Sequence, residues 1–167
     1  MDNDQRTTTL RTAAERDTLA SFLDHQRDTL AMKCAGLTPG QLRTRALQPS
    51  GLSLLGLVRH LAEVERSWFR NVLADEGRPG FWKHPDGSFA EFDVDDADPD
   101  EAFAVWRGEC EHARELVAAA PSLETPGHYG EEVFSLRWIL THMIEEYARH
   151  NGHADLLREH IDGTTGE

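Results

Sequence analysis

The longest helical pattern of the chain contains the segment Thr141-His142-Met143-Ile144-Glu145-Glu146-Tyr147-Ala148-Arg149-His150-Asn151-Gly152-His153-Ala154-Asp155-Leu156-Leu157. Apolar residues at helical spacing start at Leu136 and continue to Ile161, which predicts one long helix with a buried stripe. Two positions in the middle of this stripe are polar, Glu146 and His150. A buried carboxylate without a partner is costly in free energy, so Glu146 is expected to have a partner inside the protein.

The chain before this segment predicts further helices from capping residues and apolar periodicity. The expected caps are Thr12 with Glu15, Thr38 with Gln41, Ser53, Asp98, and Ser135 for the last helix. The predicted helices cover about residues 13–35, 39–46, 54–75, 99–120 and 136–162. Four long helices and one short helix favour an all-α fold, a four-helix bundle with a short extra helix.

A long loop separates the second and third long helices. Residues 77–99 contain several glycines and prolines and end in a run of acidic residues. A loop of this length inside a compact domain is uncommon and often functional, for example as a lid. No repeat and no shift in composition divides the chain, so we expect a loose N-terminal arm over residues 1–11, a single helical-bundle domain over residues 12–163 and a tail over residues 164–167.

Apolar residues at helical spacing also predict the core. The expected stripe of the first helix is Leu19, Phe22, Leu23, Leu30 and Cys34. The tryptophans expected to be core aromatics are Trp68, Trp106 and Trp138. The two cysteines, Cys34 and Cys110, lie among apolar neighbours and are far apart in the sequence, so they are predicted to be reduced core residues.

The charge of the chain limits its partners. The 167 residues include 17 Lys+Arg and 30 Asp+Glu, for a formal net charge of −13. Nucleic-acid binding requires a positive surface, and an anionic membrane surface repels a negative protein, so we expect neither as a partner. The N-terminus has no signal-peptide pattern, and the sequence has no apolar run of about 18 residues. Together with reduced cysteines, this predicts a cytoplasmic protein.

Three side chains on the predicted buried faces indicate a metal centre. The four-residue spacing of Glu146 and His150 places both on one helix face, roughly 5–6 Å apart at Cβ. His60 lies between Leu57 and Val64 on the apolar stripe of the second long helix. Two histidines and one carboxylate would leave coordination positions open for water or substrate, as in catalytic metal sites.

Other interpretations of the same residues stay open. A lone His60 on an apolar face is typical of a hydrogen-bonded core histidine, and Glu146 could form a structural ion pair with a histidine. Three polar interruptions on two helices favour one common explanation, which is a bound metal. His142, four residues before Glu146, and His153 are less favoured ligands.

Two motifs resemble a known family. They are Leu57-Val58-Arg59-His60-Leu61-Ala62-Glu63-Val64-Glu65 and Glu146-x-x-x-His150-Asn151-Gly152-His153. Over most of the chain, the sequence resembles the DinB/YfiT-like superfamily of metal-dependent four-helix bundles. It is most similar to the actinobacterial mycothiol-dependent branch, which includes mycothiol S-transferases and the N-terminal domain of maleylpyruvate isomerases. The resemblance implies that His60, Glu146 and His150 are the metal ligands.

The resemblance also implies a reaction. We expect a divalent-metal-dependent transferase that uses a low-molecular-weight thiol such as mycothiol. Zinc is the expected metal, with nickel or iron as alternatives, and it would hold the thiol as a thiolate that attacks a small electrophilic substrate. Two histidines and a carboxylate also suit a metal-dependent hydrolase or isomerase, or a non-haem iron oxygenase. A non-catalytic alternative is a metal-stabilised bundle that acts as a binding or stress-response module, with a homodimer as a further expectation.

Overall fold

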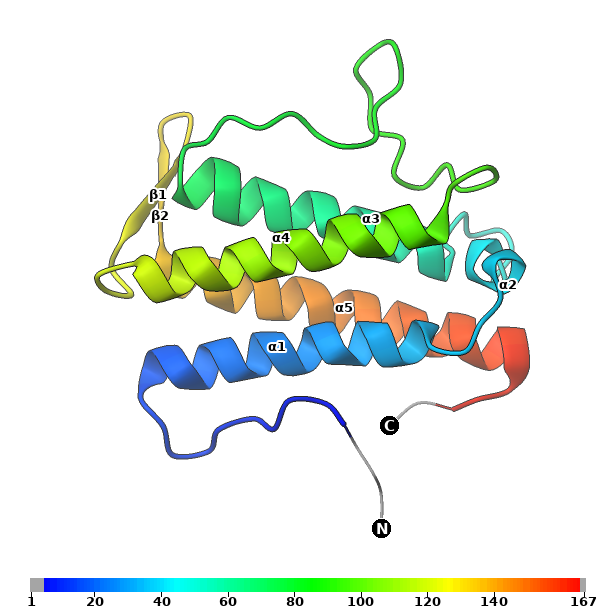
Figure 1. Cartoon of the computed structure of the whole chain (residues 1–167), viewed down its shortest axis with the longest axis horizontal. Coiled ribbons are helices and arrows are strands. Elements are labelled where there is room, and N and C mark those ends of the chain that lie inside the picture. The colour runs from blue at the N-terminus through cyan, green and yellow to red at the C-terminus, as the bar shows by residue number, and fades with distance from the viewer. Residues whose placement is uncertain (1–4, 166–167) are drawn as a thin grey trace.

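The computed structural model describes residues 5–165, and most of them are helical (Figure 1). The elements are α1 (Glu15–Cys34), α2 (Pro39–Arg43), α3 (Leu54–Glu65), the π-helix η1 (Arg66–Leu73), α4 (Pro99–Ala119), β1 (Pro126–Tyr129), β2 (Glu132–Ser135) and α5 (Leu136–Asp162). The predicted all-α class is confirmed for the main body of the protein. The exception is the small antiparallel hairpin β1–β2.

The long helices lie alongside one another (Figure 1). Helix α1 packs mainly against α5, and α3 packs mainly against α4. Helix α3 also contacts α5, so the two helices with the predicted metal ligands are neighbours. The loop over residues 74–98 runs back along the outer side of α3 before α4 begins (Figure 1). This path brings loop residues close to the middle of α3.

The core is apolar and draws residues from every long helix. Its fully buried side chains include Leu23, Leu30, Leu54, Leu57, Leu61, Phe69, Ile139, Leu140, Met143 and Tyr147. Burial of this apolar surface is the main force that holds the helices together. Cys34 and Cys110 are buried and free, as predicted from the sequence.

Most of the predicted caps are confirmed. The side chains of Ser53, Asp98 and Ser135 accept hydrogen bonds from the first turns of α3, α4 and α5, and Thr38 forms the expected capping box with Gln41. The prediction of a cap at Thr12 is wrong. Helix α1 starts at Glu15, so Ala14 occupies the capping position and makes no side-chain bond. Helix α2 ends at Arg43, before the expected Ala46, because Thr44 has an extended backbone.

Two predicted core residues lie at the surface instead. Phe22 is 42% exposed, while its neighbour Leu23 is 1% exposed, because adjacent helical residues point about 100° apart. Trp138 is 44% exposed. Its ring packs against Trp68 and Phe134, at centroid distances of 5.2 and 4.7 Å, on the outer side of α5. Trp106 is a core residue, as expected.

The helix predicted over residues 54–75 changes its period at Arg66. Up to Glu65 it is α-helical, and from Arg66 to Leu73 it is π-helical. A π-helix has no clear propensity signal, so the sequence did not indicate it. The wider turns rotate the residues after Glu65 away from the directions that a continuous α-helix would give them.

The hairpin β1–β2 lies within the segment expected to be a loop. Gly130 opens its two-residue turn with φ of +59°, a conformation that glycine adopts without strain. Gly127 lies against η1, where an added Cβ would be only 2.8 Å from the backbone oxygen of Val72. A glycine at this position therefore allows the hairpin to pack directly on η1.

The N-terminal residues that the structure describes contact α1. The backbone N–H and hydroxyl of Thr7 donate to Asp28 Oδ2 at 2.7 and 2.6 Å, and the Leu10 N–H donates to Ser21 Oγ at 2.9 Å. Residues 1–4 of the expected arm and residues 166–167 of the expected tail lie outside the described range. Across residues 5–165, every helix is too short or too polar to cross a lipid bilayer.

Candidate metal centre

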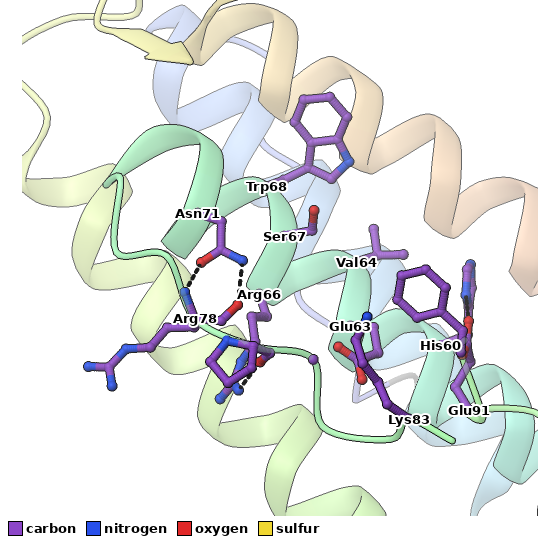
Figure 2. Close-up of a pocket in the computed structure, with 13 residues that line it drawn as sticks. His60, Glu63, Val64, Arg66, Ser67, Trp68, Asn71, Arg78, Lys83 and Glu91 are labelled. Atoms are coloured by element: carbon purple, nitrogen blue, oxygen red, sulfur yellow. Dashed lines mark hydrogen bonds and ion pairs between the residues drawn. The ribbon is translucent and has the colours of Figure 1, made fainter. Parts of the chain in front are cut away.

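His60 lies at one end of a cavity between α3, η1 and the loop over residues 78–91 (Figure 2). The cavity has a volume of about 560 Å³, and its walls include Val64, Trp68, Lys83 and Glu91. The imidazole of His60 is 21% exposed. A small molecule in this cavity would therefore contact His60 on the side of the ring that faces Glu91.

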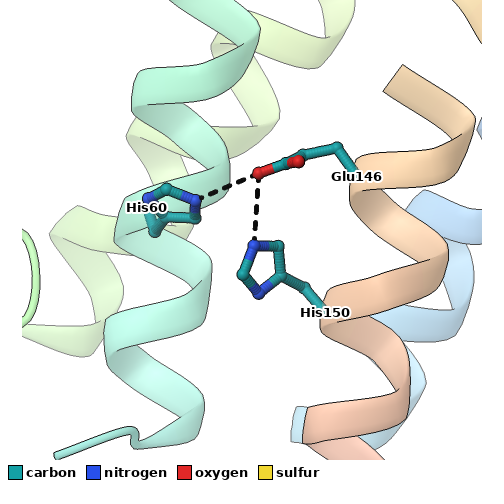
Figure 3. Close-up of side chains that lie close together, drawn as sticks. All are labelled: His60, Glu146 and His150. Atoms are coloured by element: carbon teal, nitrogen blue, oxygen red, sulfur yellow. Dashed lines mark hydrogen bonds and ion pairs between the residues drawn. The ribbon is translucent and has the colours of Figure 1, made fainter. Parts of the chain in front are cut away.

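The structure brings together the three predicted ligands, His60 from α3 and Glu146 and His150 from α5 (Figure 3). One ligand atom from each residue lies within 4.8 Å of the others. Glu146 Oε1 is 3.4 Å from His60 Nε2 and 3.2 Å from His150 Nε2. One imidazole nitrogen from α3 and one from α5 thus lie close to the same carboxylate oxygen of Glu146.

The rotation of α5 places these side chains at the edge of the core. Tyr147 and Asn151 take the fully buried positions of the helix, and their neighbours Glu146 and His150 are 19% and 12% exposed at the side chain. The sequence pattern placed Glu146 and His150 on the centre of the buried stripe, so this detail was wrong by about one residue. The consequence is a centre that is shielded from solvent but still open to small molecules.

The hydrogen-bond chemistry of His60 fits a cation. His60 Nδ1 is 3.5 Å from Glu91 Oε1, Nε2 is 3.4 Å from Glu146 Oε1, and a carboxylate can only accept. In a neutral imidazole only one nitrogen carries a hydrogen, so the lone pair of the other nitrogen faces an acceptor. Either a second proton or a metal cation must lie between them. Two imidazoles and a carboxylate are a ligand set that zinc, iron and nickel all accept.

The electrostatics of the other two residues favour their metal-binding forms. Burial alone would raise the pKa of Glu146, but the hydrogen bond from His60 and the charge of His150 outweigh it, so the pKa of Glu146 lies below its ordinary value. Burial, followed by the repulsion of His60, lowers the pKa of His150. A deprotonated carboxylate and a neutral imidazole are the forms that coordinate metals.

The two less favoured ligands have other contacts. His153 Nδ1 is 3.4 Å from His150 Nδ1, so it lies behind His150 and not beside Glu146. His142 is stacked on Trp138, with a centroid distance of 4.9 Å and an interplanar angle of 16°, and its edge contacts Trp68. Neither residue belongs to the group of three ligand atoms.

A buried polar network lies behind the candidate centre and links four helices. Glu65 Oε1 accepts from Arg27 Nε at 2.8 Å and from the Tyr147 hydroxyl at 2.7 Å, and Trp106 Nε1 donates to the Tyr147 oxygen at 2.8 Å. Arg27 and Glu65 are 4% and 0% exposed. The network fixes α3 against α5, and therefore His60 against Glu146. Glu65 and Tyr147 each occupy helical positions that suit a core residue, but the sequence showed no pairing between them.

The sequence did not predict two of the residues that contact His60. Glu91 and Phe92 come from the long loop, which has no periodicity that could place them. The Phe92 ring stacks on the His60 ring at a centroid distance of 5.3 Å. Loop positions of this kind become visible only when the chain path is known.

The fold and the centre define a class of helical protein in which a histidine of one helix meets a glutamate and a histidine of another. A family model described as mycothiol-S-transferase matches residues 18–163, and the chain belongs to this family. The resemblance to the mycothiol-dependent DinB-like branch is thereby confirmed. Neither the curated proteins nor the solved structures contain a significant match.

Proposed function

We propose that the protein is a divalent-metal-dependent S-transferase with a DinB-like four-helix-bundle domain over residues 12–163. In this proposal His60, Glu146 and His150 hold the metal, mycothiol is the thiol, and a small electrophile is the acceptor. The observation that carries the proposal is the convergence of the three side chains within 4.8 Å, in a chain of the mycothiol-S-transferase family.

The proposed reaction forms a bond between sulfur and carbon. The thiol loses its proton to water, an electron pair of sulfur forms the new C–S bond, and the leaving group departs with its bonding pair. A divalent cation would supply positive charge that keeps the thiol as the nucleophilic thiolate near neutral pH. The protein's own residues would bind and orient: α3 and α5 hold the ligand side chains, and the cavity beside His60 has room for part of a cosubstrate.

The nucleophile is expected to come from solution. Burial raises the pKa of Cys34 to about 12, and burial followed by the charge of Glu65 raises the pKa of Cys110 further still. Both thiols are buried, so neither is available as a thiolate near neutral pH. Transfer by this protein therefore requires an external thiol.

Metal content tests the ligand set. Purified wild-type protein is expected to contain close to one equivalent of divalent metal, and elemental analysis would identify it as zinc, nickel or iron. His150→Ala should lose the metal. His160→Ala is a matched control, because His160 is an exposed residue of the same helix. Equal metal in wild type and His150→Ala would remove His150 from the site.

Turnover tests the reaction. Metal-loaded protein is incubated with mycothiol and a chromogenic electrophile such as 1-chloro-2,4-dinitrobenzene, and conjugate formation is compared with His60→Ala and His160→Ala. Thiol-dependent conjugation that only His60→Ala abolishes supports the transferase. Hydrolysis of ester substrates without thiol would favour a metal-dependent hydrolase instead. Metal binding without any turnover would favour a binding module.

A further inference from the structure

The loop over residues 74–98 is held against α3 by polar contacts on both sides of Glu91. Before Glu91, the backbone N–H groups of Phe81 and Trp82 donate to Glu63 Oε1 at 2.6 and 3.0 Å. After it, the Arg59 guanidinium donates to the backbone oxygen of Asp93 at 2.5 Å. These anchors hold the chain on both sides of Glu91 close to α3.

Within this segment, two consecutive residues contact the His60 ring. Glu91 Oε1 lies 3.5 Å from Nδ1, and Phe92 stacks on the ring with an interplanar angle of 26°. Gly56 makes room for Phe92, because an added Cβ at Gly56 would be 2.9 Å from Phe92 Cδ1. Phe92 therefore restricts the rotation of the imidazole, while Glu91 offers an acceptor to Nδ1.

The burial of Glu91 is unusual for a loop carboxylate. The residue is 8% exposed, and its Oε2 has no hydrogen-bond partner among residues 5–165. Leaving a buried acceptor without a partner is costly in free energy. Glu91 and Glu146 also flank His60 on opposite sides, so two carboxylates lie against one imidazole. The charge of a divalent cation would balance them.

From these contacts we infer that Glu91 is a positioning residue for the candidate metal centre, acting through His60. It holds the hydrogen on Nδ1, so that the lone pair of Nε2 is directed toward Glu146 and His150. A carboxylate that accepts from the outer nitrogen of a histidine ligand fixes its tautomer and orientation and increases its basicity. The inference rests on the proposed metal site and assigns the long loop a part in metal binding.

Metal affinity and the tautomer of His60 test this inference, and neither depends on turnover. Zinc affinity is measured by competition with a fluorescent chelator. Glu91→Ala is expected to bind zinc about 10–100-fold more weakly than wild type. Glu91→Gln keeps a carbonyl acceptor of the same size and should lie between the two. Asp86→Ala is the matched control, since it removes an exposed carboxylate of the same loop whose hydrogen bonds are to Ser88, and its affinity should stay close to that of wild type.

The tautomer is read from the ring ¹⁵N shifts of metal-free protein above pH 8. The share of the hydrogen on Nδ1 of His60 should be larger in wild type than in Glu91→Ala, because without Glu91 only Glu146, at Nε2, can accept it. An unchanged tautomer, an affinity for Glu91→Ala within about two-fold of wild type, or an equal loss in Asp86→Ala would overturn the inference. Failure of wild type to bind zinc at all would instead contradict the proposed function.

Discussion

The Tyr147 hydroxyl donates a 2.7 Å hydrogen bond to Glu65 Oε1 in the centre of the protein, and both residues are completely buried. Tyr147 follows Glu146 in α5, and Glu65 is in the same helix as His60. This single contact therefore joins the two helices whose spacing determines whether three ligand atoms can meet.

Removal of that contact should cost stability. Tyr147→Phe keeps the ring but leaves the Trp106 N–H without its acceptor, so we expect the free energy of unfolding to fall by about 1–3 kcal/mol. Urea denaturation followed by circular dichroism measures the change. Tyr129→Phe is the control, because Tyr129 is 68% exposed and its hydroxyl is far less costly to lose. Equal stability of the two variants would show that the buried hydrogen bonds contribute nothing net.

Metal binding should stabilise the fold. A ligand that binds only the native state adds about 2.7 kcal/mol to the free energy of unfolding when its free concentration is 100 times its Kd. We expect metal-depleted wild type to gain thermal stability on addition of zinc, as measured by calorimetry. His160→Ala should gain as much, and His150→Ala should gain little. A gain in His150→Ala that matches wild type would place the stabilising zinc elsewhere.

Both thiols should be inert in the native protein. Because burial raises the pKa of Cys34 to about 12 and that of Cys110 further, the fraction of thiolate at pH 8 is very small. Ellman's reagent is expected to detect almost no thiol in native protein and both thiols after denaturation in guanidinium chloride. Rapid labelling of a native cysteine would contradict this picture and reopen the question of an internal nucleophile.

Acid should remove the contribution that Glu76 and its surface neighbours make to the free energy of unfolding. Hydrogen bonding from His112, together with Arg70 and Arg78, outweighs partial burial and lowers the pKa of Glu76 from 4.5 to about 2. The lower pKa belongs to the folded state, so this carboxylate stabilises the fold above about pH 4.5, and the contribution is lost as the pH falls toward 2. Glu76→Gln should be less stable than wild type at pH 5.5, and the difference should shrink toward pH 2.

Urea denaturation across this pH range measures the contribution of Glu76. Glu131→Gln, at the exposed turn of the hairpin, serves as the control and should follow wild type at every pH. A constant difference between Glu76→Gln and wild type from pH 5.5 to pH 2 would exclude titration of Glu76 as its cause.

Local features of the sequence were sufficient to predict the positions of most of the helices. The caps at Ser53, Asp98 and Ser135 depend on a side chain and a backbone N–H only two or three residues away, so their positions follow from adjacent residue types. The pairing of Glu146 with His150 depends in the same way on one helical turn.

The sequence by itself determined the helical segments, the apolar stripes and the one-turn spacing of Glu146 and His150, because all of these follow from helical periodicity. Only the tertiary structure decided the rotation of α5, the π-helical turn after Glu65 and the contact of Glu91 with His60. Glu91 and His60 are 31 residues apart, and Tyr147 and Glu65 are 82 apart. Such contacts depend on the packing of whole helices and on the path of a loop without periodicity, and no short stretch of sequence contains that information.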